Sequence, residues 1–258
     1  MKDPFVNIAV RAARAAGNTI IRALDRLDTV HISEKRPHDY VTDIDQQAER
    51  DIVAIIRKTY PNHGIIGEEG AEVQGDEYTW IIDPLDGTRN FIHGVPHFAV
   101  SIAVMRKGRI EQGVIYDPVR QELFTASRGK GAQLNDRRIR VSKRTIPDQC
   151  LLATGSPHTT SSDEKSAYMD SLLSVLETCK DIRRGGSAAL DLAYVACGRF
   201  DGFWEMGLKI WDIAAGVLLI KEAGGLVSDF KGGEDFLKTG HIVAANPKIL
   251  KFLLKNIK

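Results

Sequence analysis

Four groups of acidic residues in the chain have the types and positions to bind a metal ion. They are Asp43 with Asp45, Glu68 with Glu69, Asp83 with Asp86, and Asp212. Each group lies where a strand is expected to end or a helix to begin. A cluster of carboxylate oxygens with no histidine or cysteine among them favours Mg²⁺, Mn²⁺ or Ca²⁺ over zinc.

The segment 80–91 combines two of these acids with a turn that suits an anion. Asp83 follows a fully apolar run, so its carboxylate is expected close to the core, where an unpaired charge is costly. No lysine or arginine lies in that run, and a bound cation is therefore expected. Gly87 and Thr88 follow, and if a helical turn begins there, its free N–H groups point at an oxyanion. Together these features predict metal-assisted phosphate chemistry.

Each feature taken alone also has a structural explanation. Residues 43–45 fit the first turn of a helix, Asp212 fits an N-cap, and residues 68–69 fit a solvated loop. The segment 185–188, Gly-Gly-Ser-Ala before a helix, fits a second anion or hydroxyl contact as well as it fits a loop and cap. Glu205 fits either a group that accepts a hydrogen bond from a substrate hydroxyl or a solvated strand end.

The elements that must position these residues are a mixture of helices and strands. Apolar residues at helical spacing predict helices over 4–24, 43–60, 165–179, 187–197 and 213–223, and from 247 onward. Shorter apolar runs predict strands over 64–67, 79–83, 98–105, 110–116, 122–126, 150–154, 200–205, 226–228 and 242–245. The residues alone therefore predict an α/β protein of two subdomains, 1–145 with most metal ligands and 146–258, that share one cleft.

The charge balance excludes a general attraction to polyanions. Lysine and arginine number 35 against 34 for aspartate and glutamate, a formal net charge of +1. We therefore expect no membrane binding and no direct binding to nucleic acid. The amphipathic N-terminal segment matches neither a signal peptide nor a membrane span, which predicts a cytoplasmic protein. Cys150, Cys179 and Cys197 show no zinc or disulfide spacing.

The chain resembles the inositol monophosphatase family in all of that family's main motifs. The matching segments are VTDID at 41–45, GEE at 67–69, WIIDPLDGTRNF at 80–91 and WDIAAGVLLIKEAGG at 211–225. The likeness covers essentially the full chain, and the framing of the motifs is most similar to the bacterial SuhB-type branch. It implies a layered α/β (α+β) fold of the sugar-phosphatase type, an αβαβα sandwich, and a homodimer.

The resemblance also implies roles for individual residues. Magnesium would be held by Glu68, Asp83, the carbonyl of Leu85, Asp86 and Asp212. The catalytic residues would be Glu68 and Thr88, which orient the attacking water, and Asp45, which supports Thr88. Phosphate and the polyol would be contacted by Asp86, Gly87, Thr88, Gly186, Ser187, Ala188, Glu205 and Asp212.

The activity implied by the resemblance is a Mg²⁺-dependent phosphomonoesterase for inositol phosphates and related polyol phosphates. Two or three Mg²⁺ ions would take part, Mn²⁺ is a possible substitute, and lithium should inhibit. The resemblance assigns Gly87 and Thr88 to phosphate binding, and we call residues 87–90 the phosphate turn. One departure from the family pattern lies there, since many relatives have Thr-Thr-Asn where this chain has Thr88-Arg89-Asn90. The substitution adds a cation and removes no ligand.

Two other functions stay open at this stage. Members of the SuhB-type branch act in transcription with RNA polymerase and antitermination factors, using the fold as a binding platform. Other phosphatases of the superfamily share the metal motifs and act on a nucleotide 3′-phosphate, fructose bisphosphate or histidinol phosphate. Glu205, within the segment 204–212, favours the inositol type.

Overall fold

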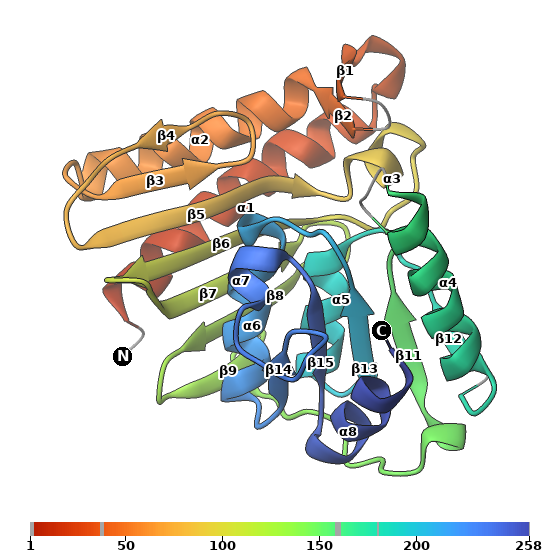
Figure 1. The fold of residues 1–258 in the computed structure, drawn as a ribbon. Coiled ribbons are helices and arrows are strands. Elements are labelled where there is room, and N and C mark those ends of the chain that lie inside the picture. The colour runs from red at the N-terminus through yellow and green to blue at the C-terminus, as the bar shows by residue number, and fades with distance from the viewer. Residues whose placement is uncertain (1–2, 37–38, 158–160, 180, 258) are drawn as a thin grey trace.

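The protein is built of five alternating layers of helix and sheet (Figure 1). We describe it from a computed structural model that covers residues 3–36, 39–157, 161–179 and 181–257. Helices α1 (Pro4–Leu24) and α2 (Asp43–Thr59) cover one face of an eight-stranded sheet. Helices α5 (Ala188–Ala196) and α6 (Ile210–Glu222) lie between that sheet and a five-stranded sheet. Helices α4 (Ser162–Leu176) and α8 (Pro247–Asn256) cover the outer face, which confirms the layered α/β sandwich.

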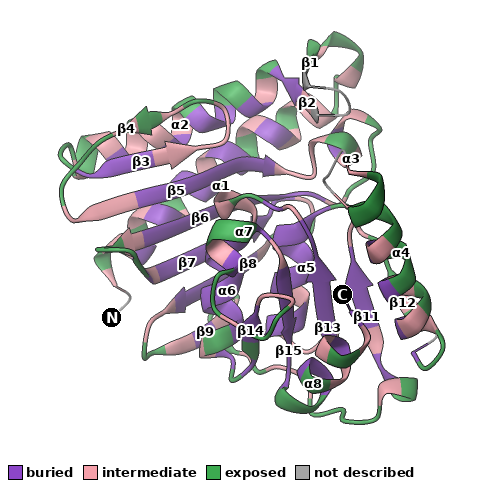
Figure 2. Cartoon of the chain, in the orientation of Figure 1, coloured by how far each residue is buried: buried purple, intermediate pink, exposed green. Residues whose placement is uncertain are grey.

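The larger sheet carries the first half of the predicted site. Its strand order is β10-β9-β8-β7-β6-β5-β3-β4, and all neighbours are antiparallel except β3 and β5, which are parallel. The strands are β3 (Gly64–Gly67), β4 (Glu72–Val73), β5 (Tyr78–Asp86), β6 (Ala99–Arg106), β7 (Arg109–Asp117), β8 (Glu122–Ser127), β9 (Gly131–Leu134) and β10 (Arg137–Arg138). Helices cover both faces, so the central strands are buried on both sides (Figure 2). Strand β5, which lies between β6 and β3, positions Asp83 and Asp86.

The smaller sheet carries the second half, in the order β12-β11-β13-β15-β14. Its strands are β11 (Leu151–Thr154), β12 (Asp181–Arg183), β13 (Gly202–Glu205), β14 (Leu226–Ser228) and β15 (Ile242–Ala245). Because α5 and α6 are enclosed by the two sheets, most of their residues are buried, and most of the buried ones are apolar. These two helices pack closely, since Gly216 of α6 lies against the side chain of Leu192.

Helix α2 begins with a capping box that the sequence alone did not fully reveal. The side chain of Thr42 accepts the N–H groups of Ile44 and Asp45, and Asp45 accepts the N–H of Thr42. The helix then buries one face, which includes Asp45, Ala48, Glu49, Ile52 and Ile56. Two acids thus lie on the side of α2 that faces the protein interior.

Most predicted elements are present, with three kinds of difference. The helix predicted to begin after Asp212 begins at Ile210, so Asp212 is its third residue instead of its N-cap. The helix predicted from Lys165 begins at Ser162. The strand predicted over 79–83 runs from Tyr78 to Asp86, so Asp83 lies inside it. The hairpin of β1 (Ile32–Arg36) and β2 (Asp39–Thr42), the short strands β4, β9, β10 and β12, and the short helix α7 (Phe236–Thr239) were not predicted. These missed elements are short and polar, so they show little periodicity.

No helix within the described residues is both long and apolar enough to cross a membrane. Strands β3 to β10 belong to the larger sheet and strands β11 to β15 to the smaller one. The connection between β10 and β11 contains residue 145. The middle core contains residues of both halves, such as Ile81 and Phe203. The division into subdomains at residue 145 therefore remains a prediction.

Candidate active site

Three of the predicted acids converge at the centre of the molecule. Asp83 and Asp86 come from β5, and Asp212 comes from the first turn of α6. One carboxylate oxygen from each lies within 4.8 Å of the other two. Asp83 is almost fully buried, with 1% of its surface exposed. The end of a strand and the start of a helix, far apart in the chain, thus meet at one point.

The electrostatics of this acidic centre call for a cation. Burial and the nearby charge of Glu68 raise the pKa of Asp83 well above its usual range. Burial and the charge of Asp86 do the same to the pKa of Asp212. Burial raises the pKa of Asp86 to about 7, against hydrogen bonds from Ser187 and Ala189 that lower it. Three carboxylates held this close are costly to ionise together, and their oxygen atoms suit a hard divalent cation.

Glu68 and Glu205 approach this centre from opposite sheets. Glu68 follows directly after β3, its backbone N–H donates to the carbonyl of Ile82 at 3.1 Å, and its side chain hydrogen-bonds Asp83. Glu205 is the last residue of β13, is buried, and lies close enough to Asp86 to raise its pKa. Both predicted acids therefore belong to the same site.

Thr88 links the phosphate turn to helix α2. It is the first residue of α3 (Thr88–Ile92), the helical turn predicted after Gly87, which has a φ of 97°. Its hydroxyl lies 2.8 Å from Oδ1 of Asp45 and 3.0 Å from the carbonyl oxygen of Leu85. Asp45 is fully buried, and burial raises its pKa although its hydrogen bonds oppose the shift. Asp45 therefore both caps α2 and contacts the predicted site.

The backbone of Leu85 contacts both Asp83 and Thr88. Its oxygen accepts the hydroxyl of Thr88, and its N–H donates to Oδ1 of Asp83 at 3.0 Å. These two bonds hold the peptide groups on either side of Leu85, and the family resemblance assigns the carbonyl oxygen to the metal. Leu85 itself is fully buried.

The segment 185–188 holds Asp86 from the other half of the chain. The hydroxyl of Ser187 donates to Oδ2 of Asp86, and the N–H of Ala189 donates to the same oxygen at 2.9 Å. Ser187 is also the N-cap of α5, because its oxygen accepts the N–H of Leu190. The segment is therefore a helix cap that also contacts Asp86, and its contact with an anion or a substrate hydroxyl remains a prediction.

Asn90 is a site residue for which the sequence analysis proposed no role. Its amide nitrogen donates to the carbonyl of His97 at 2.7 Å and to that of Gly185 at 2.9 Å. It therefore ties the phosphate turn to the turn at Gly186, which has a φ of 81°. The one available signal was an amide two residues after Thr88, within the motif that contains Asp83 and Asp86.

Arg89, the residue that departs from the family pattern, faces the β1–β2 hairpin. Its guanidinium carbon lies 5.2 Å from the centre of the Tyr40 ring, a cation–π contact. Tyr40 is two residues before Thr42, which holds Asp45. The added cation is thus in contact with the element that leads into α2.

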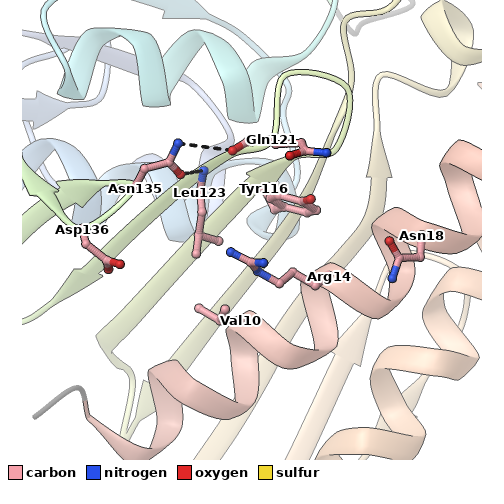
Figure 3. Close-up of a pocket in the computed structure, with 8 residues that line it drawn as sticks. All are labelled: Val10, Arg14, Asn18, Tyr116, Gln121, Leu123, Asn135 and Asp136. Atoms are coloured by element: carbon pink, nitrogen blue, oxygen red, sulfur yellow. Dashed lines mark hydrogen bonds between the residues drawn. The ribbon is translucent and has the colours of Figure 1, made fainter.

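A pocket of about 480 Å³ lies elsewhere, between α1 and the strands β7 and β8 (Figure 3). It is lined by Val10, Arg14, Asn18, Tyr116, Gln121, Leu123, Asn135 and Asp136. None of these is a predicted site residue. Its polar groups are three amides, one guanidinium, one phenol hydroxyl and one carboxylate, and they do not form an acidic cluster.

The fold and the acidic centre define a layered α/β protein with a buried carboxylate site of the kind that binds divalent cations. The model of the inositol monophosphatase family matches residues 1–258. The chain belongs to the inositol monophosphatase family.

Similar proteins carry two kinds of name. The Nus factor SuhB of Pseudomonas aeruginosa is 56% identical over 99% of this chain and 96% of the relative, and that of Escherichia coli K12 is 53% identical over the same shares. The extragenic suppressor protein suhB of Bartonella henselae has a similar crystal structure, with a TM-score of 0.96, 46% identity and 99% of each chain covered. The inositol monophosphatase of Anabaena gives a TM-score of 0.85 at 38% identity, covering 98% of this chain and 94% of that one.

Proposed function

We propose that this protein is a Mg²⁺-dependent phosphomonoesterase that hydrolyses inositol monophosphates and related polyol phosphates. The observation that carries the proposal is the meeting of Asp83, Asp86 and Asp212 within 4.8 Å, beside the turn that opens α3. Membership of the inositol monophosphatase family supports the same activity.

The metal would be held by Glu68, Asp83, the Leu85 carbonyl, Asp86 and Asp212. These donors are all oxygens, and the raised pKa of three of the acids fits a site that needs positive charge. Bound Mg²⁺ supplies Lewis-acid polarisation of the phosphate and lowers the pKa of a water ligand. Two or three ions are proposed, with Mn²⁺ as a substitute.

The chain's own residues would orient the attacking water. A hydroxyl has one hydrogen, and that of Thr88 is directed to Asp45 or Leu85. The remaining lone pairs of Thr88 are therefore available to accept a hydrogen from water. Glu68 would orient the same water from the side of β3.

The substrate would lie between the phosphate turn and the second half of the chain. Gly87 and Thr88 would present backbone N–H groups to the phosphate, since the first N–H groups of a helical turn have no partner within it. The polyol hydroxyls would meet Glu205 and the segment 186–188. Glu205 is a buried acceptor at the end of β13, which suits a hydroxyl-rich substrate.

A phosphate-release panel tests this proposal. Inositol 1-phosphate, fructose 1,6-bisphosphate and adenosine 3′,5′-bisphosphate are each assayed with and without Mg²⁺, and with added Li⁺. We expect Mg²⁺-dependent release that is highest for inositol 1-phosphate and is inhibited by Li⁺. Preference for either bisphosphate would move the protein to another phosphatase type, and release without Mg²⁺ would contradict the metal assignment.

A second proposed function is protein binding in transcription antitermination, favoured by relatives named Nus factor SuhB at 53% and 56% identity. RNA polymerase and antitermination factors are then the proposed partners, and the chain would act as a homodimer in the cytoplasm. A pull-down with purified polymerase and antitermination factors, using wild type and Asp83→Asn, separates the two functions. If wild type and Asp83→Asn bind the partners equally, partner binding is independent of catalysis. If neither binds any partner, the antitermination role is contradicted and only the phosphatase proposal remains.

A further inference from the structure

We infer that Glu49 is a positioning residue that sets the direction of Glu68, in the same way that Asp45 supports Thr88. This inference rests on the proposed metal-dependent function. Glu49 lies one helical turn after Asp45 on the buried face of α2, with 5% of its surface exposed. It is not one of the predicted ligands.

The Glu49 carboxylate holds the loop that carries Glu68 by two backbone contacts. Its Oε2 accepts the N–H of Glu69 at 2.9 Å, and its Oε1 accepts the N–H of Ala71 at 2.9 Å. Charge-assisted bonds to backbone N–H groups are stronger than neutral ones. The carboxylate therefore determines the path of the chain directly after Glu68.

The other contacts of this loop leave Glu68 little freedom. The N–H of Gly67 donates to the carbonyl of Ala71 at 2.7 Å, and the N–H of Glu68 donates to the carbonyl of Ile82 at 3.1 Å. Three successive N–H groups, at residues 67–69, thus have fixed acceptors. Of these three acceptors, only the Glu49 carboxylate belongs to a side chain. It is therefore the only one of the three that a substitution can remove without changing the backbone.

Gly67 shows that the loop and Glu49 are fitted to each other. A Cβ at this position would overlap the Glu49 carboxylate and would lie 3.1 Å from the Cβ of Ala71. The glycine before Glu68 therefore makes room for the acid. This gives the first residue of the Gly-Glu-Glu motif a physical role.

Helix α2 thus supports both groups that are proposed to orient water. Asp45 accepts the hydroxyl of Thr88, and Glu49 accepts the N–H next to Glu68. The helix lies beside β3 and β5 (Figure 1). The two acids are one turn apart on a rigid element, so the positions of Thr88 and Glu68 are coupled through it. Mutation of a residue that holds a metal ligand in position commonly lowers metal affinity or activity by about 10- to 100-fold.

The test uses the full-length protein with Glu49→Gln and, as a second variant, Gly67→Ala. A glutamine has one acceptor oxygen, so it satisfies one of the two N–H groups and presents its own N–H₂ to the other. Gly67→Ala keeps Glu49 in the sequence, but the new methyl group overlaps the Glu49 carboxylate and pushes it away from the loop. Both variants are compared with Asp51→Asn, since Asp51 also lies on α2 and accepts two side chains, Thr19 and Gln47.

Three measurements separate positioning from a general loss of structure. Calorimetric titration of Mg²⁺ should show about tenfold weaker binding in both test variants and unchanged binding in Asp51→Asn. Hydrogen exchange at the amides of Glu69 and Ala71 should be faster in Glu49→Gln before Mg²⁺ is added. In the phosphatase assay, the Mg²⁺ concentration for half-maximal rate should rise about tenfold, while the KM for inositol 1-phosphate stays nearly constant.

The outcomes are distinguishable from failure of the proposed function. Wild-type Mg²⁺ affinity in a folded Glu49→Gln variant would overturn the positioning role. A wild-type protein that binds Mg²⁺ but releases no phosphate would overturn the proposed activity, and the titration and exchange measurements would still decide the role of Glu49. If Glu49→Gln failed to fold, Gly67→Ala would be decisive through the same titration.

Discussion

The acidic centre and the pocket under α1 are opposite kinds of site. The centre brings together Asp83, Asp86 and Asp212 within 4.8 Å, with Asp83 fully enclosed by protein. The pocket has a volume of about 480 Å³, and its polar side chains are mainly exposed amides, with the exposed Arg14 among them (Figure 3).

The comparison indicates that the burial of like-charged carboxylates, more than the volume of a pocket, marks the candidate active site of this protein. Buried like charges destabilise a fold, so they persist only where a cation or a reaction uses them. An exposed arginine beside amides costs nothing and needs no such explanation. The predictions below test this contrast, beginning with the largest expected effect.

Asp83→Asn should lower phosphate release by about a thousandfold or more, because it removes a metal-binding charge next to the transition state. The same change should raise the melting temperature of the metal-free protein, because it relieves repulsion by Glu68, Asp86 and Asp212. Thermal unfolding and the release assay measure both effects on one sample. Loss of activity with a lower melting temperature would indicate simple unfolding instead.

The metal-free protein should lose stability as the pH rises from about 4 to about 7. The pKa of Asp86 is raised from 3.8 to about 7 in the folded state, so the folded protein binds more protons than the unfolded chain in this range. Stabilisation is therefore complete at low pH and is lost as the pH passes the folded-state pKa. Melting temperatures at pH 5 and pH 8 should differ by roughly several degrees, and Mg²⁺ should remove the difference at pH 8. A metal-free protein that is more stable at pH 8 would contradict the repulsion between the acids.

Asn90→Ala should reduce kcat by about tenfold to a hundredfold. The variant loses the hydrogen bonds to the carbonyls of His97 and Gly185. A buried polar group left without its partner costs about 1–3 kcal/mol of free energy. Steady-state kinetics measure the loss. Asn90→Asp is the matched control, since it keeps the size but cannot donate when ionised, and it should be equally impaired. Normal kinetics in Asn90→Asp would show that the bridge does not matter.

Arg89→Thr, which restores the common family residue, should change KM by about threefold or less. An exposed cation–π contact contributes about 0.5–1 kcal/mol, and this one joins Arg89 to Tyr40 outside the acidic centre. Tyr40→Phe keeps the ring and should change nothing. A large loss of kcat in Arg89→Thr would mean that the guanidinium contacts substrate directly.

Arg14→Ala should leave phosphate release and its Mg²⁺ dependence unchanged within error. Arg14 lines the pocket under α1, 5.9 Å from the ring of Tyr116, and contacts none of the predicted site residues. The release panel described above is the measurement. A substantial change would show that this pocket communicates with the acidic centre and would remove the contrast between the two sites.

The local patterns carried much of the fold. The apolar run before Asp83 predicted β5, and apolar residues at helical spacing predicted α1 and α2. The motif residues Asp83, Asp86 and Asp212 were recognised because their types suit a hard cation. Periodicity reports burial along a single element, and these elements are long enough to show it.

Other features had no local signal. The β1–β2 hairpin is short and polar, so its pairing did not appear in the pattern. The helix containing Asp212 begins earlier than predicted, because periodicity marks a helix boundary poorly. Asn90 and Glu49 each act on backbone groups of distant segments, and a contact of this kind leaves no spacing in the sequence.

The residues by themselves determined an α/β protein and the chemical types of the site residues, because these depend on residue type and on near-neighbour periodicity. The family, and the layered fold that it implies, followed from the resemblance of the motifs. Only the tertiary structure decided that Ser187 bonds Asp86 across 101 residues, and that Asp45 and Glu49 support two loops from one helix. The physical reason is that burial and repulsion arise only when distant segments pack together. A carboxylate has an ordinary pKa in the unfolded chain and a raised one beside its neighbours in the folded protein.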